Sequence, residues 1–539
     1  MKYPRILPLA SACLRAAALP GWLTPWLGPL SVIPRIVYWE IGGDRRGDLM
    51  GGILFWGLAF SILSTTGGLM PFGAALVMGG LWVFEGFLFR RLRSFFKPEF
   101  AAPLSLFTTQ WLVGEFFFGG VPWATWGLGF ADNSWFLTMA TAVGENGVSL
   151  LILLLGGWLW SFSRGWKGVG FLCPVLLLFA FEIGRTQESE PVSHVSFAAV
   201  QPNLGLGAKT ANGGEVAIFQ KHESMLSAAL GNSAPPELLC WAETMFLLPA
   251  TLSEADGEIR IPRRGLPGQP TVYPADGVRD LMEHAAAQVA SPLSEGGHFL
   301  TGAHTYEPVA PELAGNVVSP RSSSTLVFNQ AGALVGNVGK SELVPFGETL
   351  PFDGRFPGSP AIANWVFEKF GLSPDFARAP EPEPLLLSRP DGTSWSLGTA
   401  VCWENAFERV FREQAQGNCQ AFIIFSNEAW YGLGAEMDQM VATTRFRAAE
   451  TGRAILRATN TGITVLMDSR GKEITSLPRG TESVLFGELP LVDEGVRTPY
   501  LVWGWVVSPL LSSLCLLLVG LATLKGKTGK EKASGPPLS

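Results

Sequence analysis

Three short segments of this 539-residue chain carry side chains that together could transfer an acyl group. Glu243, Lys340 and Cys402 each stand at the end of a predicted strand, so a sheet could bring them to one edge. The thiol would attack an ester carbonyl, and the carboxylate would take the thiol proton as a general base. The ammonium, with the backbone N–H that follows the cysteine, would stabilise the oxyanion.

Each of these residues also has an ordinary structural explanation. A cysteine after an apolar strand, such as Cys402, is more often an inert core thiol than a nucleophile. Glu243 could cap a following helix, and Lys340 could be a solvated loop charge. Residue type and spacing alone therefore leave both the acyl-transfer set and these explanations open.

Other common chemistries find little support in the sequence. None of the five histidines lies in an HExxH or GxSxG context, which argues against a zinc site and against a Ser–His–Asp hydrolase. No GxxxxGK[ST] or GxGxxG motif stands between a strand and a helix. The net charge of −7 gives no reason to expect nucleic acid. We therefore predict no metal, no cofactor and no nucleic-acid partner.

The segments that must position the three residues alternate between strand-like and helix-like patterns. Short apolar runs bounded by turn residues predict strands at 195–200, 237–241, 298–304, 323–328, 396–401 and 421–426. Amphipathic patterns predict helices at 215–230, 277–289 and 438–451. Gly- and Pro-rich composition predicts loops at 203–214, 253–275 and 305–322. The Pro-rich segment 351–390 is either a mobile lid or a packed surface loop. The alternation indicates an α/β layered sandwich.

The composition adds a membrane part. The chain is 47% hydrophobic and 16% charged, whereas about a quarter of an average soluble protein is charged. Apolar stretches, several close to the roughly 20 residues that a spanning helix needs, lie at 6–20, 22–38, 49–66, 71–90, 103–119, 137–162, 168–185 and 499–524. We predict an N-terminal transmembrane domain of about seven spans at 1–185, an α/β domain at 186–498, a transmembrane helix at 499–524 and a basic tail at 525–539.

Basic residues in the loops orient these spans. With a cytoplasmic N-terminus, the inner loops and the tail carry arginines and lysines, while the outer loops around 67–70 and 120–134 have none. This pattern follows the positive-inside rule and places residues 186–498 outside the cytoplasmic membrane. The inner basic positions are Arg45, Arg46, Arg90, Arg91, Arg93, Lys97, Arg164, Lys167, Lys525, Lys527, Lys530 and Lys532.

The cysteines give no disulfide framework. The six cysteines form no CxxC pair, and a Cys240–Cys419 bridge stays open on the sequence alone. Residues 10–13 (ASAC) resemble a lipoprotein cleavage site, but the apolar run before them is only about eight residues long. We therefore predict an uncleaved first span.

The three segments resemble the nitrilase superfamily, whose Glu–Lys–Cys triads occur in this chain order. More narrowly, nearly the whole chain is similar to the apolipoprotein N-acyltransferase family, the integral-membrane branch of that superfamily. The matching segments are Trp241–Thr244 (WAET, for W-P-E-T), Lys340–Glu348 (KSELVPFGE), Ser426–Gly432 (SNEAWYG, for S-N-D-A-W-F-G), Arg445–Gly462 (RFRAAETGRAILRATNTG) and Gly119–Trp123 (GGVPW, for G-F-P-W). Departures at Ala242, Trp403 and Met440 concern the lining of the pocket and leave the triad intact.

The resemblance implies a multi-span α-helical membrane domain joined to a nitrilase-like αββα sandwich. It also implies a two-step reaction in which Cys402 takes an acyl chain from a membrane phospholipid as a thioester. A diacylated apolipoprotein then accepts the chain on its N-terminal amine, with Glu243 as general base and Lys340 as oxyanion stabiliser. The supporting or substrate-binding residues that the resemblance carries over are Glu348, Trp403, Glu404 and Trp123. Trp123 is equally suited to anchoring at the membrane interface.

Two other functions compete with this interpretation. A membrane-anchored amidase or nitrilase would share the thioester step and pass the acyl group to water. A non-catalytic lipid-binding scaffold could keep the fold without the reaction. The seven predicted N-terminal spans favour a lipid substrate over the amidase, because one span would suffice as an anchor. The joint presence of Glu243, Lys340 and Cys402 argues against the scaffold.

Overall fold

The structure is a computed structural model that describes residues 4–61, 70–165, 172–186, 190–205, 207–208, 214–231, 234–262, 270–311, 317–350, 355, 357–370, 374–432 and 434–533. The chain forms two compact units. A helical unit contains Met1–Glu188, Gly434–Glu450 and Arg497–Ser539, and a sandwich unit contains Ser189–Leu433 and Thr451–Val496. The predicted combination of an apolar helical domain with an α/β sandwich is confirmed.

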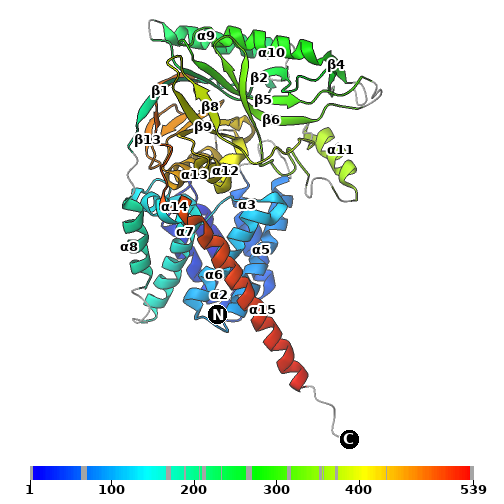
Figure 1. Ribbon diagram of the computed structural model, residues 1–539. Coiled ribbons are helices and arrows are strands. Elements are labelled where there is room, and N and C mark those ends of the chain that lie inside the picture. The colour runs from blue at the N-terminus through cyan, green and yellow to red at the C-terminus, as the bar shows by residue number, and fades with distance from the viewer. Residues whose placement is uncertain are drawn as a thin grey trace. The chain divides into compact units, whose positions relative to one another are not determined.

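In the helical unit, each apolar stretch of the sequence contains a helix (Figure 1). Within the described part of the chain, three segments are long and apolar enough to cross a membrane by length and composition, namely Phe72–Leu92, Ser134–Ser163 and Gly504–Lys525. The helices are α1 (Ile6–Ala17), α2 (Leu27–Glu40), α3 (Arg45–Ala59), α5 (Met70–Leu92), α6 (Pro98–Phe116), α7 (Ser134–Ser163), α8 (Leu172–Arg185), α14 (Pro499–Val502) and α15 (Val507–Ala533).

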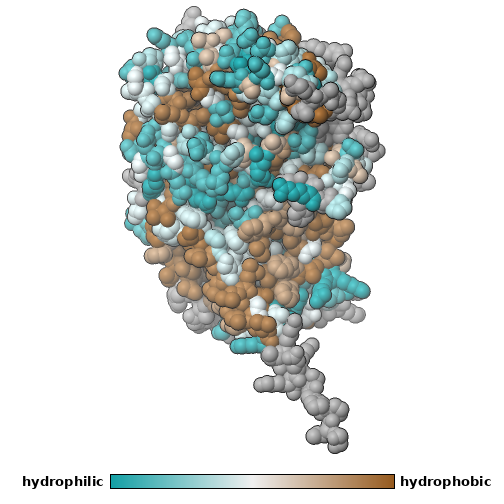
Figure 2. Space-filling view, turned by 45° about the vertical axis from the view of Figure 1, so that its right-hand side comes forward, coloured by the Kyte–Doolittle hydropathy of each residue, from teal (hydrophilic) through white to brown (hydrophobic). Residues whose placement is uncertain are grey.

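The surface of the helical unit is apolar. In Figure 2 hydrophobic residues cover much of the surface around these helices. Along α15 the leucines at 510, 514, 517, 521 and 524 are all exposed, and their three- and four-residue spacing puts them on one helix face. An exposed apolar stripe of this length is unfavourable in water and suits contact with lipid tails.

Helix α13 (Glu436–Thr451) belongs to the helical unit through residue 450, although the chain places it between two strands of the sandwich. Ala442, Phe446 and Ala449 recur at helical spacing and pack into a core with residues of α7 and α8. The sequence predicts this helix as part of the α/β domain at 186–498, because it lies between predicted strands. Its apolar face instead packs against α7 and α8 of the helical unit.

A break in α7 receives α13. Gly144 has φ +69°, and a Cβ there would lie 2.5 Å from the Tyr500 ring, so only glycine fits. The break frees the N–H of Glu145, which donates to Glu450 Oε1 at 2.7 Å. Arg447 lies between Glu145 and Glu450, with N–O distances of 2.7 and 2.9 Å.

The sandwich unit contains two six-stranded sheets. The first has the order β14-β1-β2-β5-β6-β7 and the second the order β13-β12-β11-β10-β9-β8. The strands of the first sheet are β1 (Ser193–Gln201), β2 (Leu238–Ala250), β5 (His298–Tyr306), β6 (Arg321–Asn329), β7 (Leu334–Gly339) and β14 (Ser483–Leu491). Those of the second are β8 (Leu385–Ser388), β9 (Ser394–Val401), β10 (Ala421–Ser426), β11 (Ile455–Thr459), β12 (Val465–Met467) and β13 (Glu473–Ser476).

Side-chain alternation along the strands builds the layers. In β1, Val195 and Phe197 enter the core between the two sheets, whereas Ala198 and Val200 enter a second core under α9 (Gly214–Leu230) and α10 (Ala275–Ala290). Helix α12 (Glu408–Gln416) covers the other sheet. The αββα arrangement predicted from the family resemblance is therefore present (Figure 1).

Two sequence expectations need correction or completion. The predicted loop 253–275 contains an antiparallel pair of strands, β3 (Glu258–Ile261) and β4 (Thr271–Pro274). Each strand is only four residues long and lies among Gly and Pro residues, so the sequence shows no clear alternation of apolar and polar side chains there. In the Pro-rich segment 351–390, residues 359–370 form α11, and Ala379 N–H donates to Lys340 O at 3.0 Å. Residues 351–354, 356 and 371–373 of the suggested lid lie outside the described part of the chain.

None of the six cysteines, which all lie in the described part of the chain, forms a disulfide bond. Cys240 is fully buried in the core between the sheets, and Cys419 is also buried. The Cys240–Cys419 bridge that the sequence left open is therefore not formed.

Neighbouring leucines on β8 test the sandwich. Leu387 is 2% exposed and faces the core, whereas Leu386 is 67% exposed on the other face. We expect Leu387→Ala to lower the free energy of unfolding by about 2–5 kcal/mol and Leu386→Ala by less than about 0.5 kcal/mol. Thermal unfolding of the full chain in detergent measures both, and equal losses would contradict the assigned strand faces.

Candidate active site

Glu243 lies within β2, where the strand is irregular. The pairing register with β5 shifts between Trp241 and Phe246, and Thr244 has a φ of +53°. We expected Glu243 at a strand end, but β2 continues to Ala250. A strand end would have freed the Glu243 side chain from the regular alternation of the sheet. The irregularity has the same effect, because it turns a side chain out of the regular pleat. No helix follows for Glu243 to cap.

Lys340 directly follows β7 and is fully buried. Its Nζ lies 2.8 Å from Glu348 Oε1 and 3.8 Å from Glu243 Oε1. Burial alone would lower the pKa of Lys340, but the charges of Glu348 and Glu243 outweigh it and raise the pKa above its ordinary value. The ammonium is therefore charged at neutral pH, and it is not a solvated loop charge.

Glu348 is held by its own loop. Its Oε2 accepts the Val344 N–H at 2.9 Å while Oε1 accepts from Lys340. The loop between them turns tightly, with Phe346 at φ +64°. The LVPFGE motif therefore forms a carboxylate clamp that fixes the lysine ammonium in place.

Cys402 follows β9 with a φ of +52°, a conformation that costs a non-glycine residue energy. Its side chain is 8% exposed. Burial raises the pKa of the Cys402 thiol well above its usual value, Glu243 raises it further, and Lys340 lowers it. The thiol is therefore protonated at neutral pH, so nucleophilic attack requires a base.

Glu404 ties the lysine loop to the cysteine turn. Its Oε1 accepts from Ser341 N at 2.7 Å, Ser341 Oγ at 2.9 Å and Glu342 N at 3.2 Å. Its Oε2 accepts from Val401 N, directly before the cysteine, at 2.8 Å. Burial raises the pKa of Glu404, but these donors favour its charged form. The carboxylate serves as a positioning group, with both oxygens occupied by the protein.

The two predicted tryptophans occupy different units. Trp403 follows the cysteine and packs edge-on against Phe407, with ring centroids 5.9 Å apart. Trp123 lies in the helical unit, where it is nearly buried and lines a small cavity. The structure thus brings Glu243, Lys340, Glu348, Cys402, Trp403 and Glu404 into one region of the sandwich, and Trp123 belongs to another part of the molecule.

Sequence reasoning missed three polar residues around the cluster, although all lie in segments that carried the resemblance. Asn427 N–H donates to Glu243 Oε2 at 3.0 Å and thereby orients the carboxylate. The fully buried Glu428 is paired with Arg457, and its charge raises the pKa of Cys402. A Cβ on Gly462 would collide with Glu428, so glycine is required beside this carboxylate.

The cluster is equipped for nucleophilic acyl transfer. It offers a thiol on a strained turn, a carboxylate whose second oxygen is near the ammonium, and a fixed positive charge for a developing oxyanion. Among the described residues no group of three or more His, Cys, Asp or Glu side chains is arranged to hold a metal ion.

Comparison with known proteins gives consistent relationships. Residues 300–496 match the carbon-nitrogen hydrolase family. A protein from Caulobacter vibrioides named apolipoprotein N-acyltransferase is 28% identical over 536 residues, covering 93% of this chain and 88% of the relative. One of the same name from Pseudomonas putida is 26% identical, covering 94% of this chain and 91% of the relative.

Among solved structures, the chain is similar to Saccharomyces cerevisiae Nit3 of the nitrilase superfamily, with 14% identity and a TM-score of 0.35 over 56% of this chain and 91% of that chain. An amidase from Nesterenkonia sp. shows 16% identity and a TM-score of 0.36, over 59% of this chain and 99% of the amidase.

The charges around Cys402 predict how its reactivity depends on pH. Because the thiol pKa is raised, we expect alkylation of Cys402 by iodoacetamide to be slow at pH 7 and to rise about tenfold per pH unit up to pH 9. Lys340→Gln removes a charge that lowers this pKa, so alkylation at pH 8 should become slower.

Mass spectrometry of the Cys402 peptide measures the rate, and the fully buried Cys240 serves as an internal control that should not react in the folded protein. A wild-type rate that is constant between pH 7 and 9 would mean that the thiol is already ionised, contrary to the structure.

Proposed function

We infer that this chain, a member of the apolipoprotein N-acyltransferases within the carbon-nitrogen hydrolase superfamily, transfers a fatty acyl chain to the N-terminal amine of lipoproteins. The acyl donor is a membrane phospholipid, and the carrier is a thioester on Cys402. The acceptor is the N-terminal diacylglyceryl-cysteine of an apolipoprotein.

One observation carries the assignment of the site. A buried ammonium, held by the carboxylates of Glu348 and Glu243, faces a cysteine on a strained turn, and the same chain carries helices long enough to cross a membrane. The first half of this observation supports thioester chemistry. The second half supports a lipid substrate.

In the first step Glu243 takes the proton of the Cys402 thiol while Sγ bonds to the carbonyl carbon of the phospholipid ester. Lys340 Nζ and the backbone N–H of Trp403 stabilise the oxyanion. When the tetrahedral intermediate collapses, the carbon–oxygen ester bond breaks and the leaving alkoxide takes the proton from Glu243. The products are an acyl thioester and a lysophospholipid.

In the second step the acceptor amine attacks the thioester carbonyl, and Glu243 takes a proton from the amine nitrogen. The carbon–sulfur bond then breaks, and the Cys402 thiolate is reprotonated from Glu243. The amide bond forms and the enzyme returns to its starting state. Asn427, by its hydrogen bond to Glu243 Oε2, supports the orientation of the base through both steps.

The proposed location is a bacterial cytoplasmic membrane, with several spans and with the sandwich on the outer side. The distribution of lysines and arginines among the loops supports this orientation. Both substrates are lipids or lipid-modified, and a domain tethered by apolar helices on both sides of its sequence acts where such substrates lie.

A membrane-bound amidase remains the chief competing function, because it would use the same thioester with water as acceptor. The relatives that cover more than nine-tenths of this chain carry the acyltransferase name, which supports an amine acceptor. The two activities separate in the second half of the reaction.

Thioester formation tests the donor half-reaction. After incubation with labelled phosphatidylethanolamine, we expect an acyl adduct on the Cys402 peptide by mass spectrometry. Cys402→Ala should abolish the adduct, and Lys340→Gln should slow its formation at least about 100-fold through loss of oxyanion stabilisation. Adduct at wild-type levels in Cys402→Ala would overturn the mechanism.

The acceptor half-reaction follows from the same sample. Adding a diacylated lipopeptide should discharge the thioester and give an N-acylated peptide in equal amount. Release of free fatty acid without N-acyl peptide would favour the amidase instead. A lipopeptide with a blocked N-terminal amine is the matched control and should remain unmodified.

The membrane orientation can be tested with two exposed positions, Glu254 in the sandwich and Lys525 at the start of the tail. In intact spheroplasts, a membrane-impermeant maleimide should label Glu254→Cys but not Lys525→Cys, and lysis should make both reactive. Peptide mapping separates these sites from the native cysteines. Labelling of Lys525→Cys in intact cells would reverse the proposed orientation.

A further inference from the structure

Asn460, directly after β11, uses its whole side-chain amide inside the sandwich. Its Nδ2 donates to Leu204 O at 2.7 Å and to Asn427 Oδ1 at 2.9 Å. Its Oδ1 accepts the Leu204 N–H at 2.8 Å. The residue is 1% exposed. Because Leu204 offers both a donor and an acceptor, the amide fits in one orientation only, with its second N–H directed at Asn427.

The partners of Asn460 come from both sheets. Leu204 lies just beyond β1 of the first sheet, and Asn427 directly follows β10 of the second. Backbone hydrogen bonds strengthen the connection, because Asn203 N donates to Asn460 O at 3.0 Å and Asn460 N donates to Ser426 O at 3.2 Å. Asn460 therefore fixes the end of β10 against the exit of β1.

This series of hydrogen bonds ends on the carboxylate of the candidate active site. The Asn427 N–H donates to Glu243 Oε2 at 3.0 Å, and Glu243 Oε1 lies 3.8 Å from Lys340 Nζ. The Asn427 side chain is itself held at its oxygen, where Oδ1 accepts from Asn460 and from the Ala429 N–H at 3.4 Å. A shift at Asn460 is therefore passed through Asn427 to one oxygen of Glu243.

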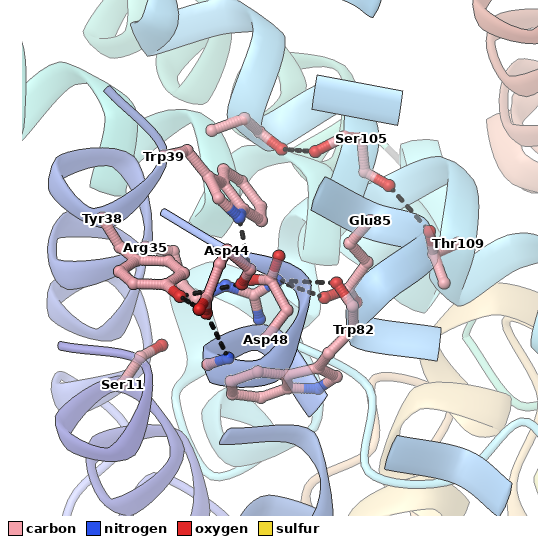
Figure 3. Close-up of polar contacts among 12 residues, drawn as sticks. Ser11, Arg35, Tyr38, Trp39, Asp44, Asp48, Trp82, Glu85, Ser105 and Thr109 are labelled. Atoms are coloured by element: carbon pink, nitrogen blue, oxygen red, sulfur yellow. Dashed lines mark hydrogen bonds and ion pairs between the residues drawn. The ribbon is translucent and has the colours of Figure 1, made fainter. Parts of the chain in front are cut away.

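A buried polar cluster of the helical unit provides a contrast. In Figure 3 the Arg35 guanidinium is directed at Glu85, with an Nη2–Oε2 distance of 2.8 Å, and Trp39 Nε1 donates to Asp48 Oδ1 at 2.9 Å. These bonds join α2, α3 and α5 and include none of the reacting groups. The network of Asn460 differs because its last member is the carboxylate that the mechanism uses as a base.

We propose that Asn460 is a positioning residue for acyl transfer, which acts through Asn427 to hold the Glu243 carboxylate in the orientation that takes and returns the Cys402 proton. The role of Glu243 as base rests on the proposed function. A general base must lie within hydrogen-bond reach of the proton that it takes, so a small displacement slows the chemical step. Substrate binding does not depend on this alignment and should change little.

Asn460→Asp breaks this connection with little change in shape. An aspartate keeps an acceptor for the Leu204 N–H but has no N–H to donate to Asn427. The turn that follows β10 keeps a second anchor, since Glu428 Oε1 accepts from Ser426 Oγ at 2.8 Å and pairs with Arg457.

Gln420→Glu is the matched control, because it makes the same change in a buried amide at the opposite end of β10. Gln420 Oε1 accepts from Ser396 N and its Nε2 donates to Val492 O, both at 3.1 Å. Neither partner belongs to the candidate active site, so this variant measures the cost of the change itself.

Acylation of Cys402 by p-nitrophenyl butyrate tests the role without any phospholipid. Sγ bonds to the carbonyl carbon, Glu243 takes the thiol proton, and nitrophenolate leaves in a burst that Cys402→Ala should lack. We expect Asn460→Asp to lower the burst rate constant at saturating ester about 10- to 100-fold and to change the half-saturating concentration less than about threefold. Gln420→Glu should change either quantity less than about twofold.

Asn427→Ala removes the same side-chain bond from its other end. Because both variants lose one shared interaction, the double variant should be less than about threefold slower than the slower single variant. Thermal unfolding verifies that each variant is folded, and Asn427→Ala keeps the test valid if Asn460→Asp is not.

A parental burst rate in folded Asn460→Asp or Asn427→Ala overturns the proposal. So does an effect confined to the half-saturating concentration, or a double variant in which the two losses multiply, because both results would mean a general structural defect.

The small ester separates this proposal from the proposed function. A chain that is acylated by the nitrophenyl ester but not by phosphatidylethanolamine would refute the proposed function and leave the positioning role standing. A chain that is acylated by both without dependence on Asn460 would do the reverse. Acylation by neither ester would refute Glu243 as the base for Cys402, and the positioning role with it.

Discussion

The burial of the Lys340 ammonium is the constraint on which the sandwich's candidate site depends. A charge removed from water is tolerated only when opposite charges replace the lost hydration, and Glu348 and Glu243 do so. Glu348 compensates the charge at 2.8 Å and is anchored by its own loop. Glu243, at 3.8 Å, is close enough to stabilise the ammonium and remains able to exchange a proton.

The rest of the site follows from keeping this arrangement fixed. Glu404 accepts hydrogen bonds from both the lysine loop and the strand before Cys402, so the ammonium and the thiol cannot drift apart independently. Asn427 orients Glu243, and the Glu428–Arg457 pair fills the space beside Gly462. A strained cysteine turn persists under these conditions because the surrounding hydrogen bonds determine it. This turn brings the Cys402 thiol close to the Glu243 carboxylate and the Lys340 ammonium.

Buried charges in the helical unit must also be compensated within the protein. Buried polar groups among apolar helices must find partners inside the protein, and Arg35 and Arg447 both do. The break at Gly144 even creates a backbone donor that Glu450 of α13 satisfies. Arg15 is compensated less directly, by the Ala124 carbonyl and by the faces of the Phe55 and Trp126 rings.

The sequence by itself determined the apolar helices, the three segments that carry Glu243, Lys340 and Cys402, and the strands β1, β2, β5, β6, β9 and β10. These features depend on local periodicity, on turn residues and on motifs within about ten residues, all of which can be seen in one chain. Tertiary structure alone decided that Glu243 sits in an irregular strand, that Asn427 orients it across 184 residues, and that Glu404 reaches Ser341 across 63. It also decided that α13 packs with α7 and α8 of the helical unit. Partners so distant in sequence leave no periodic signal, because folding, and not spacing, brings them together.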